Sequence, residues 1–374
     1  MVRMTRKERL EAIVAGRIPD RPAIKVWGAT PGQACVHPAF VPVRDLAAQY
    51  TDLMLGASSP FHIYCGQHSV NLIESETQPT SSPEWVNQVT TYHTPDGALQ
   101  STFRASTVGK PGYEQEHLLK EPADIGKLLS LPYTPYPITL KDVEHTSANL
   151  GDAGIVLYGL DHPAYALERL IGSENFALWS LDAPEQILEA ITVFQQRLRA
   201  HVEATLAAGY RGLVGWVGPE LCIPPLLPPS TFDEYVTAID APLIDLLHEG
   251  GCRVWVHCHG KMRPVLKRFL AMGVDVLNPI EPPPMGDITL EEAFACVGDA
   301  MALEGNIETH DLMTATTDEI RAQVHAVLDQ GANHRFILCP SSGYMENINP
   351  TAGEIENWRL FITEGVRYAD TLAC

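Results

Sequence analysis

The apolar positions of the chain fall into eight short runs, several of them rich in β-branched residues, which alternate with amphipathic segments. The segment over 183–208 places apolar residues three or four positions apart, as on one buried helix face. Segments 232–247, 262–272, 290–297 and 317–328 have the same spacing. Such an alternation predicts a parallel sheet covered by helices. The runs cover 23–27, 52–55, 155–158, 212–217, 253–259, 275–280, 301–307 and 335–338.

Eight strands in a chain of 374 residues predict an α/β fold in which a single (β/α)₈ barrel spans 1–374. The alternative is a doubly wound open sheet. That fold would usually carry a glycine-rich phosphate turn after an early strand, and the sequence has none. The pattern therefore favours the barrel.

Residues 57–150 interrupt the alternation between the second and third expected strands. Within them Val89 and Tyr92 precede the turn Thr94-Pro95-Asp96-Gly97, and Phe103 follows it. An Asp-Gly turn between β-forming residues indicates a hairpin. Because long insertions in a compact domain usually have a function, we expect 57–150 to form a lid or a docking wall.

Charge and cysteine usage narrow the class of protein. Lys and Arg number 26 against 46 Asp and Glu, so the net charge of −20 argues against a nucleic-acid-binding surface. No apolar run approaches the roughly 20 residues that span a bilayer, and the charged start is unlike a signal peptide. We therefore expect a soluble cytoplasmic protein. Its eight widely spaced cysteines do not predict a disulfide framework.

The clearest chemical signal is the pair His257 and His259 at the end of the fifth run. Successive side chains of a strand point to opposite faces, so the two imidazoles share a face and Cys258 points away toward the helices. Active sites of barrels lie at the carboxyl ends of the strands. From this pair alone, a catalytic site and two hydrogen-bonded core histidines are equally good interpretations.

Other polar residues at strand ends favour a site. Glu281 follows the sixth run and Cys339 ends the eighth, so both converge on the histidines at the barrel mouth. Imidazole, carboxylate and thiolate ligands in tetrahedral coordination select zinc, which predicts a Zn²⁺ site of His257, His259, Cys339 and Glu281. We expect Glu281 and Glu220 to be catalytic. Other mouth residues predicted to bind substrate are Trp27, Tyr158, Asp161, His162, Trp216 and Asn306.

Three segments resemble the uroporphyrinogen decarboxylase superfamily, and within it the cobalamin-dependent methyltransferase branch. They are WVHCHGKMRPVLKRFLAMGVDVLNPIEPPPMGD from Trp255, ALEGNIETHDLM from Ala302 and FILCPSSGY from Phe336. YGLDH from Tyr158 and WVGPE from Trp216 fit as well, so the resemblance is best over about 150–370. It implies a (β/α)₈ barrel, in agreement with the hydrophobic pattern.

The two branches of this superfamily imply different chemistry. The decarboxylases hold a porphyrinogen through arginines of an N-terminal loop, whereas the matching segment here, 26–33, has no arginine. The methyltransferases hold zinc through a His-x-Cys pair and a distant cysteine, positions that match His257 and Cys339. His259 replaces the cysteine of the pair, which leaves at most one thiolate on the metal. A more electrophilic zinc suits an oxygen donor better than a thiol.

The resemblance thus implies a zinc-dependent methyltransferase of the O-demethylase type. It would move a methyl group from a small, methoxylated donor to cobalamin or another corrinoid, carried on a partner protein. The alternatives are a decarboxylase-type lyase and a non-catalytic barrel that binds a tetrapyrrole. A homodimer is possible. Tyr344 and Glu346 follow the eighth run and are within reach of the barrel mouth.

Overall fold

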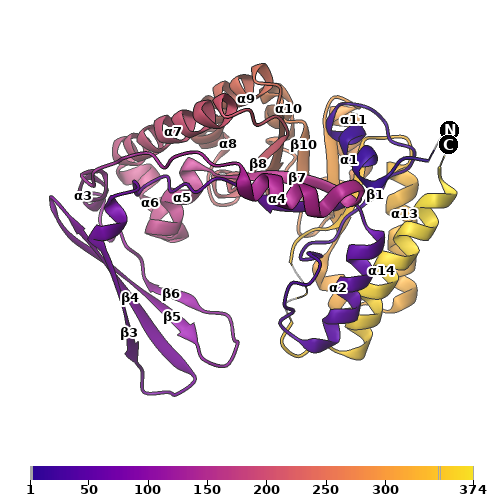
Figure 1. The fold of residues 1–374 in the computed structure, drawn as a ribbon, viewed down its shortest axis with the longest axis horizontal. Coiled ribbons are helices and arrows are strands. Elements are labelled where there is room, and N and C mark those ends of the chain that lie inside the picture. Colours follow the sequence, from indigo (N-terminus) through magenta and orange to yellow (C-terminus); the bar gives the residue numbers. More distant parts are fainter. Residues whose placement is uncertain (1–2, 344, 346, 374) are drawn as a thin grey trace.

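An eight-stranded parallel sheet, sheet A, forms the centre of the molecule in the computed structural model, which describes residues 3–343, 345 and 347–373 (Figure 1). Tyr344 and Glu346 lie outside these described residues. The strand order is β1-β12-β11-β10-β9-β8-β7-β2, and each expected run contributes one strand. The strands are β1 (Ala23–Ile24), β2 (Leu53–Ala57), β7 (Gly154–Asp161), β8 (Leu213–Val217), β9 (Arg253–His257), β10 (Val276–Ile280), β11 (Ala302–Ile307) and β12 (Phe336–Pro340).

Sheet A is curled, with helices around its outer face, so the (β/α)₈ barrel prediction is confirmed. The helices are α1 (Arg6–Val14), α2 (Val41–Tyr50), α3 (Asp124–Leu129), α4 (Lys141–Leu150), α5 (Pro163–Ile171), α6 (Ser173–Asp182), α7 (Pro184–Ala207), α8 (Pro229–Phe232), α9 (Ala238–Glu249), α10 (Leu266–Met272), α11 (Leu290–Val297), α12 (Thr309–Thr314), α13 (Thr317–Gly331) and α14 (Ala352–Thr371). Short turns of helix are η1 (Pro38–Phe40), η2 (Ser69–Leu72), η3 (Gly151–Ala153), η4 (Pro219–Cys222) and the π-helical η5 (Asp233–Thr237).

Two expected helices differ from the pattern. The segment over 232–247 is divided into α8, the π-helical turn η5 and α9, and Pro242 lies inside α9. The segment over 262–272 becomes helical only at Leu266. Pro264 disfavours helical backbone at the residue before it, so the helix starts after the proline although the apolar spacing begins earlier.

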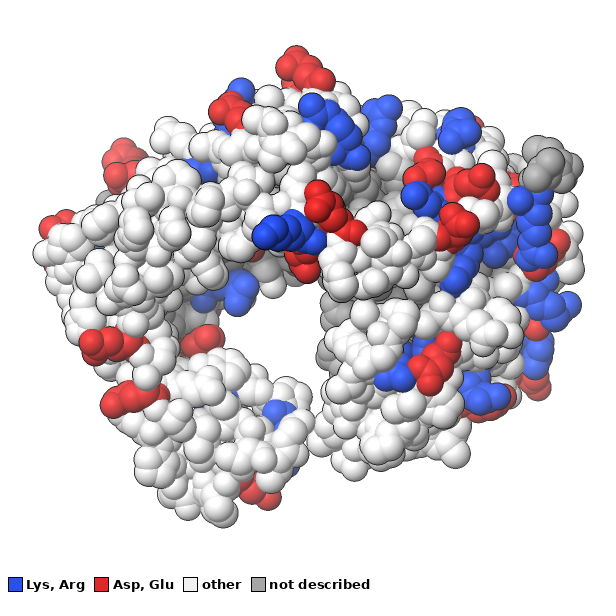
Figure 2. All heavy atoms as spheres, viewed as in Figure 1, with Lys and Arg blue, Asp and Glu red and all other residues white. Residues whose placement is uncertain are grey.

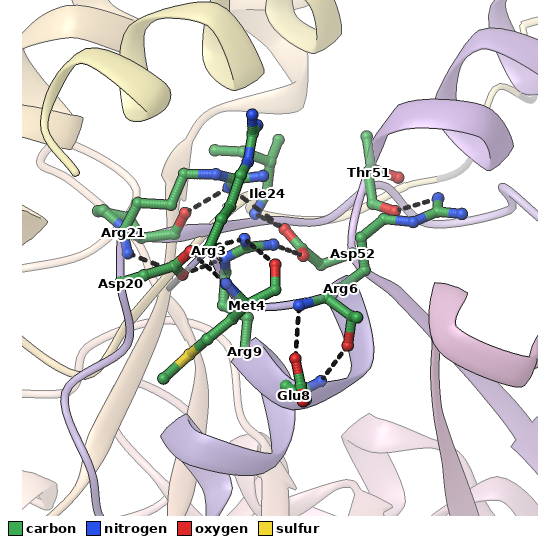
Figure 3. A network of polar contacts seen from close by, with 12 residues as sticks. Arg3, Met4, Arg6, Glu8, Arg9, Asp20, Arg21, Ile24, Thr51 and Asp52 are labelled. Carbon is green, nitrogen blue, oxygen red and sulfur yellow. Dashed lines mark hydrogen bonds and ion pairs between the residues drawn. The ribbon is translucent and has the colours of Figure 1, made fainter. Parts of the chain in front are cut away.

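The edge strands β1 and β2 meet at a seam held by Asp52 (Figure 3). The Asp52 backbone N–H donates to the Ile24 carbonyl at 2.7 Å, and its Oδ2 accepts from the Ile24 N–H at 2.8 Å. Arg9 of α1 donates from Nη1 to Asp52 Oδ1 at 2.6 Å and from Nε to Asp20 Oδ1 at 2.8 Å. One carboxylate therefore joins α1, β1 and β2 under the barrel.

A separate antiparallel sheet, sheet B, projects from the barrel as an arm (Figure 1). Its central strands pair from Trp85↔Ser106 to Thr94↔Gly97, so the Asp-Gly turn lies at the tip of a hairpin. The arm and the barrel enclose an opening whose rim carries side chains of both charges (Figure 2). The strands of sheet B are β3 (Ile73–Pro79), β4 (Trp85–Thr94), β5 (Gly97–Ser106) and β6 (Tyr113–Glu116).

The helices and the cysteines of the described residues give two further findings. None of their helices is both long and apolar enough to cross a membrane. Their seven cysteines are all free thiols, in agreement with the absence of a disulfide pattern in the sequence.

Candidate functional site at the barrel mouth

The carboxyl ends of β9 and β10 bring two histidines and one glutamate together. The rings of His257 and His259 have centroids 4.4 Å apart and stand edge to face, so the two side chains share the inner side of the barrel as predicted. His257 Nδ1 lies 2.6 Å from Asn278 Oδ1, and His259 Nδ1 lies 2.9 Å from Glu281 Oε1. The other Glu281 oxygen accepts from the Gly260 N–H at 2.6 Å. Asn278 on β10 therefore fixes Nδ1 of His257, and Glu281, directly after β10, fixes Nδ1 of His259.

These neighbours give the two imidazoles different charge states. Burial lowers the pKa of His257 to about 4, and the adjacent His259 adds to the effect, so His257 is neutral at pH 7. Burial alone would also lower the pKa of His259, but its bond to Glu281 outweighs this and raises the pKa. The same bond holds the pKa of Glu281 below its usual value despite burial. His259 and Glu281 thus form a pair that can hold a proton beside a neutral imidazole.

A cavity of 310 Å³ opens beside these histidines. Its walls are mainly apolar, and Trp27, Trp216 and Trp255 supply three aromatic faces. Trp255 stacks on His257 at a centroid distance of 5.9 Å, and Trp27 stands edge-on to both rings. The full lining is Trp27, Leu157, Gly159, Leu160, Gly215, Trp216, Val217, Trp255, His257, His259, Ser342 and Gly343.

A second cavity of 510 Å³ lies along the N-terminal loop and shares Trp27 and Leu157 with the first. The remaining walls come from residues 26–36 and 53–56 and from Met345. Neither cavity is lined by a described lysine or arginine. A ligand with several carboxylates would find no described lysine or arginine to pair with in either space.

Beneath the mouth lies a buried ion pair that the sequence analysis did not identify. Lys25 Nζ forms a salt bridge and hydrogen bond with Glu304, and both side chains are no more than 1% exposed. The same ammonium lies 3.4 Å from the centroid of the Trp27 ring, and Glu304 Oε2 accepts from Trp255 Nε1 at 2.9 Å. A lysine and a glutamate inside two apolar runs were the available signal, because such charges are buried only when they are paired.

Cys339 and Cys258 point in opposite directions with respect to the barrel. Cys258 is fully buried in the cluster that joins the outer strand faces to the helices, as the strand alternation predicts. Cys339 is also fully buried, and the Glu304 carboxylate acts on its thiol. Burial and that carboxylate raise the pKa of the Cys339 thiol, so it holds its proton at neutral pH.

The structure places three of the predicted substrate-binding residues outside the cavity beside the histidines. Tyr158 is buried against α7, with its hydroxyl 3.0 Å from His201 Nε2, and His162 lies 3.2 Å from Asp240. Asn306 donates to the Ile280 carbonyl at 2.8 Å. None of these three side chains lines the cavity beside the histidines.

The remaining predicted residues are Trp216, Glu220 and Asp161. Trp216 lines the cavity and donates from Nε1 to Asp240 at 3.1 Å, so the buried Asp240 carboxylate orients it. Glu220 accepts from the Gly218 N–H at 3.0 Å, and burial raises its pKa although His259 opposes this. Asp161 lines a different cavity, between α5 and the arm.

The predicted metal ligands fit zinc in chemistry, but they are not assembled around one point. Among the described residues no group of three or more His, Cys, Asp and Glu side chains is arranged to hold a metal ion. His257 fits best, because it is neutral and no hydrogen bond joins its Nε2 to another described residue. Glu281 is bonded to His259, and Cys339 would have to lose its proton.

Comparison with known proteins gives a family and a fold. The family model described as Uroporphyrinogen decarboxylase (URO-D) matches residues 94–355. Among solved structures, a methyltransferase from Methanosarcina mazei aligns over 98% of this chain and 99% of its own, with a TM-score of 0.62 and 16% identity. A D-psicose 3-epimerase from Clostridium cellulolyticum H10, at a TM-score of 0.34 and 13% identity, covers 63% of this chain and 85% of its own. Among curated proteins no match was found.

Proposed function

Because the chain belongs to the uroporphyrinogen decarboxylase (URO-D) family, we propose that it is a member that transfers methyl groups, with zinc at the barrel mouth and a corrinoid as acceptor. The observation that carries the proposal is the neutral His257 beside His259 in an aromatic cavity that no described lysine or arginine lines. A decarboxylase acting on a polycarboxylate needs cations at this place. The likeness in fold to the Methanosarcina mazei methyltransferase supports the same choice.

Zinc would be held by His257, His259 and Cys339, with Glu281 either as a further ligand or as the group that orients His259. When bound, it would act as a Lewis acid on the heteroatom that carries the methyl group. The Nδ1 bond to Asn278 fixes the tautomer and ring orientation of His257, which leaves Nε2 as its ligand atom.

The residues of the cavity suit an aromatic methyl ether. Trp27, Trp216 and Trp255 provide faces and edges against which an aromatic ring packs. In the proposed reaction the carbon–oxygen bond of the ether would break, the methyl group would pass to the corrinoid acceptor, and the leaving oxygen would take one proton. Glu220 is suited to supply that proton, because its raised pKa keeps a larger protonated fraction than an exposed carboxyl has.

A comparison of three donor classes tests this function. The purified protein, loaded with zinc, is mixed with Co(I) cobalamin and a methoxyaromatic compound, methanethiol or a methylamine, and methylcobalamin formation is followed by absorbance. We expect the ether to react fastest, because a site with at most one thiolate favours a leaving oxygen. Reaction of the thiol or amine alone would refute the donor class. No transfer from any donor, together with binding of cobalamin, would favour a non-catalytic barrel.

A further inference from the structure

A third cavity, of 360 Å³, lies between the arm and the barrel and is separate from the histidine site. The arm contributes Tyr92, Ser101 and Glu114, the loop after β2 contributes Tyr64, and the barrel side contributes Asp161 and Arg169. This cavity shares no lining residue with the cavity beside His257. It is therefore a candidate for a second bound molecule.

Charges of both signs face this cavity. Asp161 at the end of β7 and Glu114 on β6 contribute carboxylates to the lining, and Arg169 on α5 contributes a guanidinium. Arg169 makes no ion pair within 4.0 Å of a described carboxylate, although its field acts on both Asp161 and Glu114. The walls desolvate both carboxyls, which raises the pKa of each. All three side chains are exposed in the free protein, so a ligand in the cavity can reach and pair with them.

The remaining wall is aromatic. Phe61, Tyr64, Tyr92 and Tyr165 line the cavity, and the Arg169 guanidinium lies 6.0 Å from the centroid of the Tyr165 ring. Aromatic faces accept both apolar groups and ammonium groups. The cavity therefore offers a guanidinium, two carboxylates and an apolar surface within one space, and the His62 imidazole is also in its lining.

We infer that this cavity binds a small zwitterion of the amino-acid type, with its carboxylate on Arg169, its ammonium group on Asp161 and Glu114, and an apolar side chain against the tyrosines. A simple anion would be repelled by two carboxylates, and a simple cation would be repelled by Arg169. Only a molecule that carries both charges satisfies the whole lining. Because the wall comes from the arm and the barrel together, the bound molecule holds the arm against the barrel.

Calorimetric titration with a matched set of ligands tests this inference. L-phenylalanine carries both charges, 3-phenylpropanoate keeps only the carboxylate, and 2-phenylethylamine keeps only the ammonium group. We expect L-phenylalanine to bind at least about tenfold more tightly than either analogue. L-leucine and glycine show how much the apolar side chain contributes. Absence of binding for all three amino acids, or equal binding of L-phenylalanine and one analogue, would overturn the inference.

Variants of the charged lining residues test whether the amino acid binds in this cavity. Arg169→Gln and Asp161→Asn should each weaken L-phenylalanine binding by about tenfold or more, and Glu114→Gln should do so from the arm side. Arg199→Gln is the control, because Arg199 lies on the exposed side of α7 and pairs with Glu203. Undiminished binding in Arg169→Gln would place the amino acid elsewhere and refute the assignment.

Hydrogen exchange measures the effect on the arm. With L-phenylalanine bound, amides of 85–106 and of α5 should exchange more slowly, while those of α13 on the far side should not change. Protection confined to the barrel mouth would contradict a site shared with the arm. The titration measures binding alone, so it succeeds or fails independently of methyl transfer.

Discussion

At the scale of single residues, the direction of each side chain at the end of β9 determines which groups meet at the mouth. His257 and His259 point inward, and Cys258 between them is packed toward the helices. This alternation was predictable, because it follows from strand geometry alone. The partners Asn278 and Glu281 were harder to predict as hydrogen-bond partners, since they depend on the register between β9 and β10.

The zinc content of single variants distinguishes residues that point into the barrel from residues that point toward the helices. We expect about one zinc per chain after gel filtration at neutral pH, with loss below about pH 5 as the imidazoles protonate. His257→Ala and Cys339→Ser should lower the content strongly, whereas Cys258→Ser should leave it unchanged. Elemental analysis of the variants measures this directly. Equal losses in the two cysteine variants would refute the assignment of Cys339, and no zinc in protein grown with ample metal would refute the site.

A buried histidine away from the mouth gives a pH-dependent stability. Burial lowers the pKa of His201 to about 4, so this histidine is neutral in the folded protein. The unfolded chain binds the proton near the ordinary pKa of about 6.5, so stability is full above that pH and is lost as the pH falls toward about 4. Between pH 7.5 and 5.5 the loss is roughly 1.4 kcal/mol.

The variant His201→Gln checks the sign and size of this effect. Glutamine can keep a hydrogen bond to the Tyr158 hydroxyl but does not titrate. Denaturant unfolding of the metal-free protein at both pH values should therefore show a smaller loss in the variant, by about 1 kcal/mol. An identical pH dependence in the two proteins would show that His201 is not the responsible group.

At the scale of elements, the pair Lys25 and Glu304 connects strands that are not neighbours. Lys25 follows β1, Glu304 lies on β11, and Trp255 of β9 donates to the same carboxylate. Such a contact across the barrel interior could not be derived from the sequence pattern, because it depends on closure of the sheet. The strands themselves were predictable, since each has its own apolar run.

Removal of one partner of this pair should be costly. Lys25→Met leaves the Glu304 carboxylate buried without its cation, and we expect a loss of about 3–5 kcal/mol in the free energy of unfolding. The double variant Lys25→Met/Glu304→Gln removes both charges and should recover a large part of that loss. Denaturant titration of the unchanged protein, Lys25→Met, Glu304→Gln and the double variant measures the coupling. A double variant as unstable as the sum of the singles would show that the two charges act separately.

At the scale of the whole molecule, the barrel closes through polar contacts rather than through a ladder of backbone bonds. Asp52 accepts hydrogen bonds from Arg9 and from the Ile24 backbone, and it is fully buried (Figure 3). The hydrophobic pattern predicts eight strands but does not show how the first and second meet. The charged residue that opens the run over 52–55 was the signal available in the sequence.

Asp52→Ala tests the importance of this seam. It leaves the buried Arg9 with a single carboxylate, Asp20, and removes the acceptor of the Ile24 N–H, so we expect about 3–5 kcal/mol of destabilisation. Asp45→Ala is the control, because Asp45 is an exposed aspartate on α2. Unfolding curves that coincide for Asp52→Ala and the control would contradict the role of the seam.

The arm and the barrel share no strand, since sheet B and sheet A form separate hydrogen-bonded sheets. A change of sequence or length in β4 and β5 therefore leaves the register of β9 and β10 intact. In evolutionary terms, selection can reshape the outer wall while the histidines keep their positions. Related chains adapted to different small molecules should then differ most in the arm and least at the ends of the barrel strands.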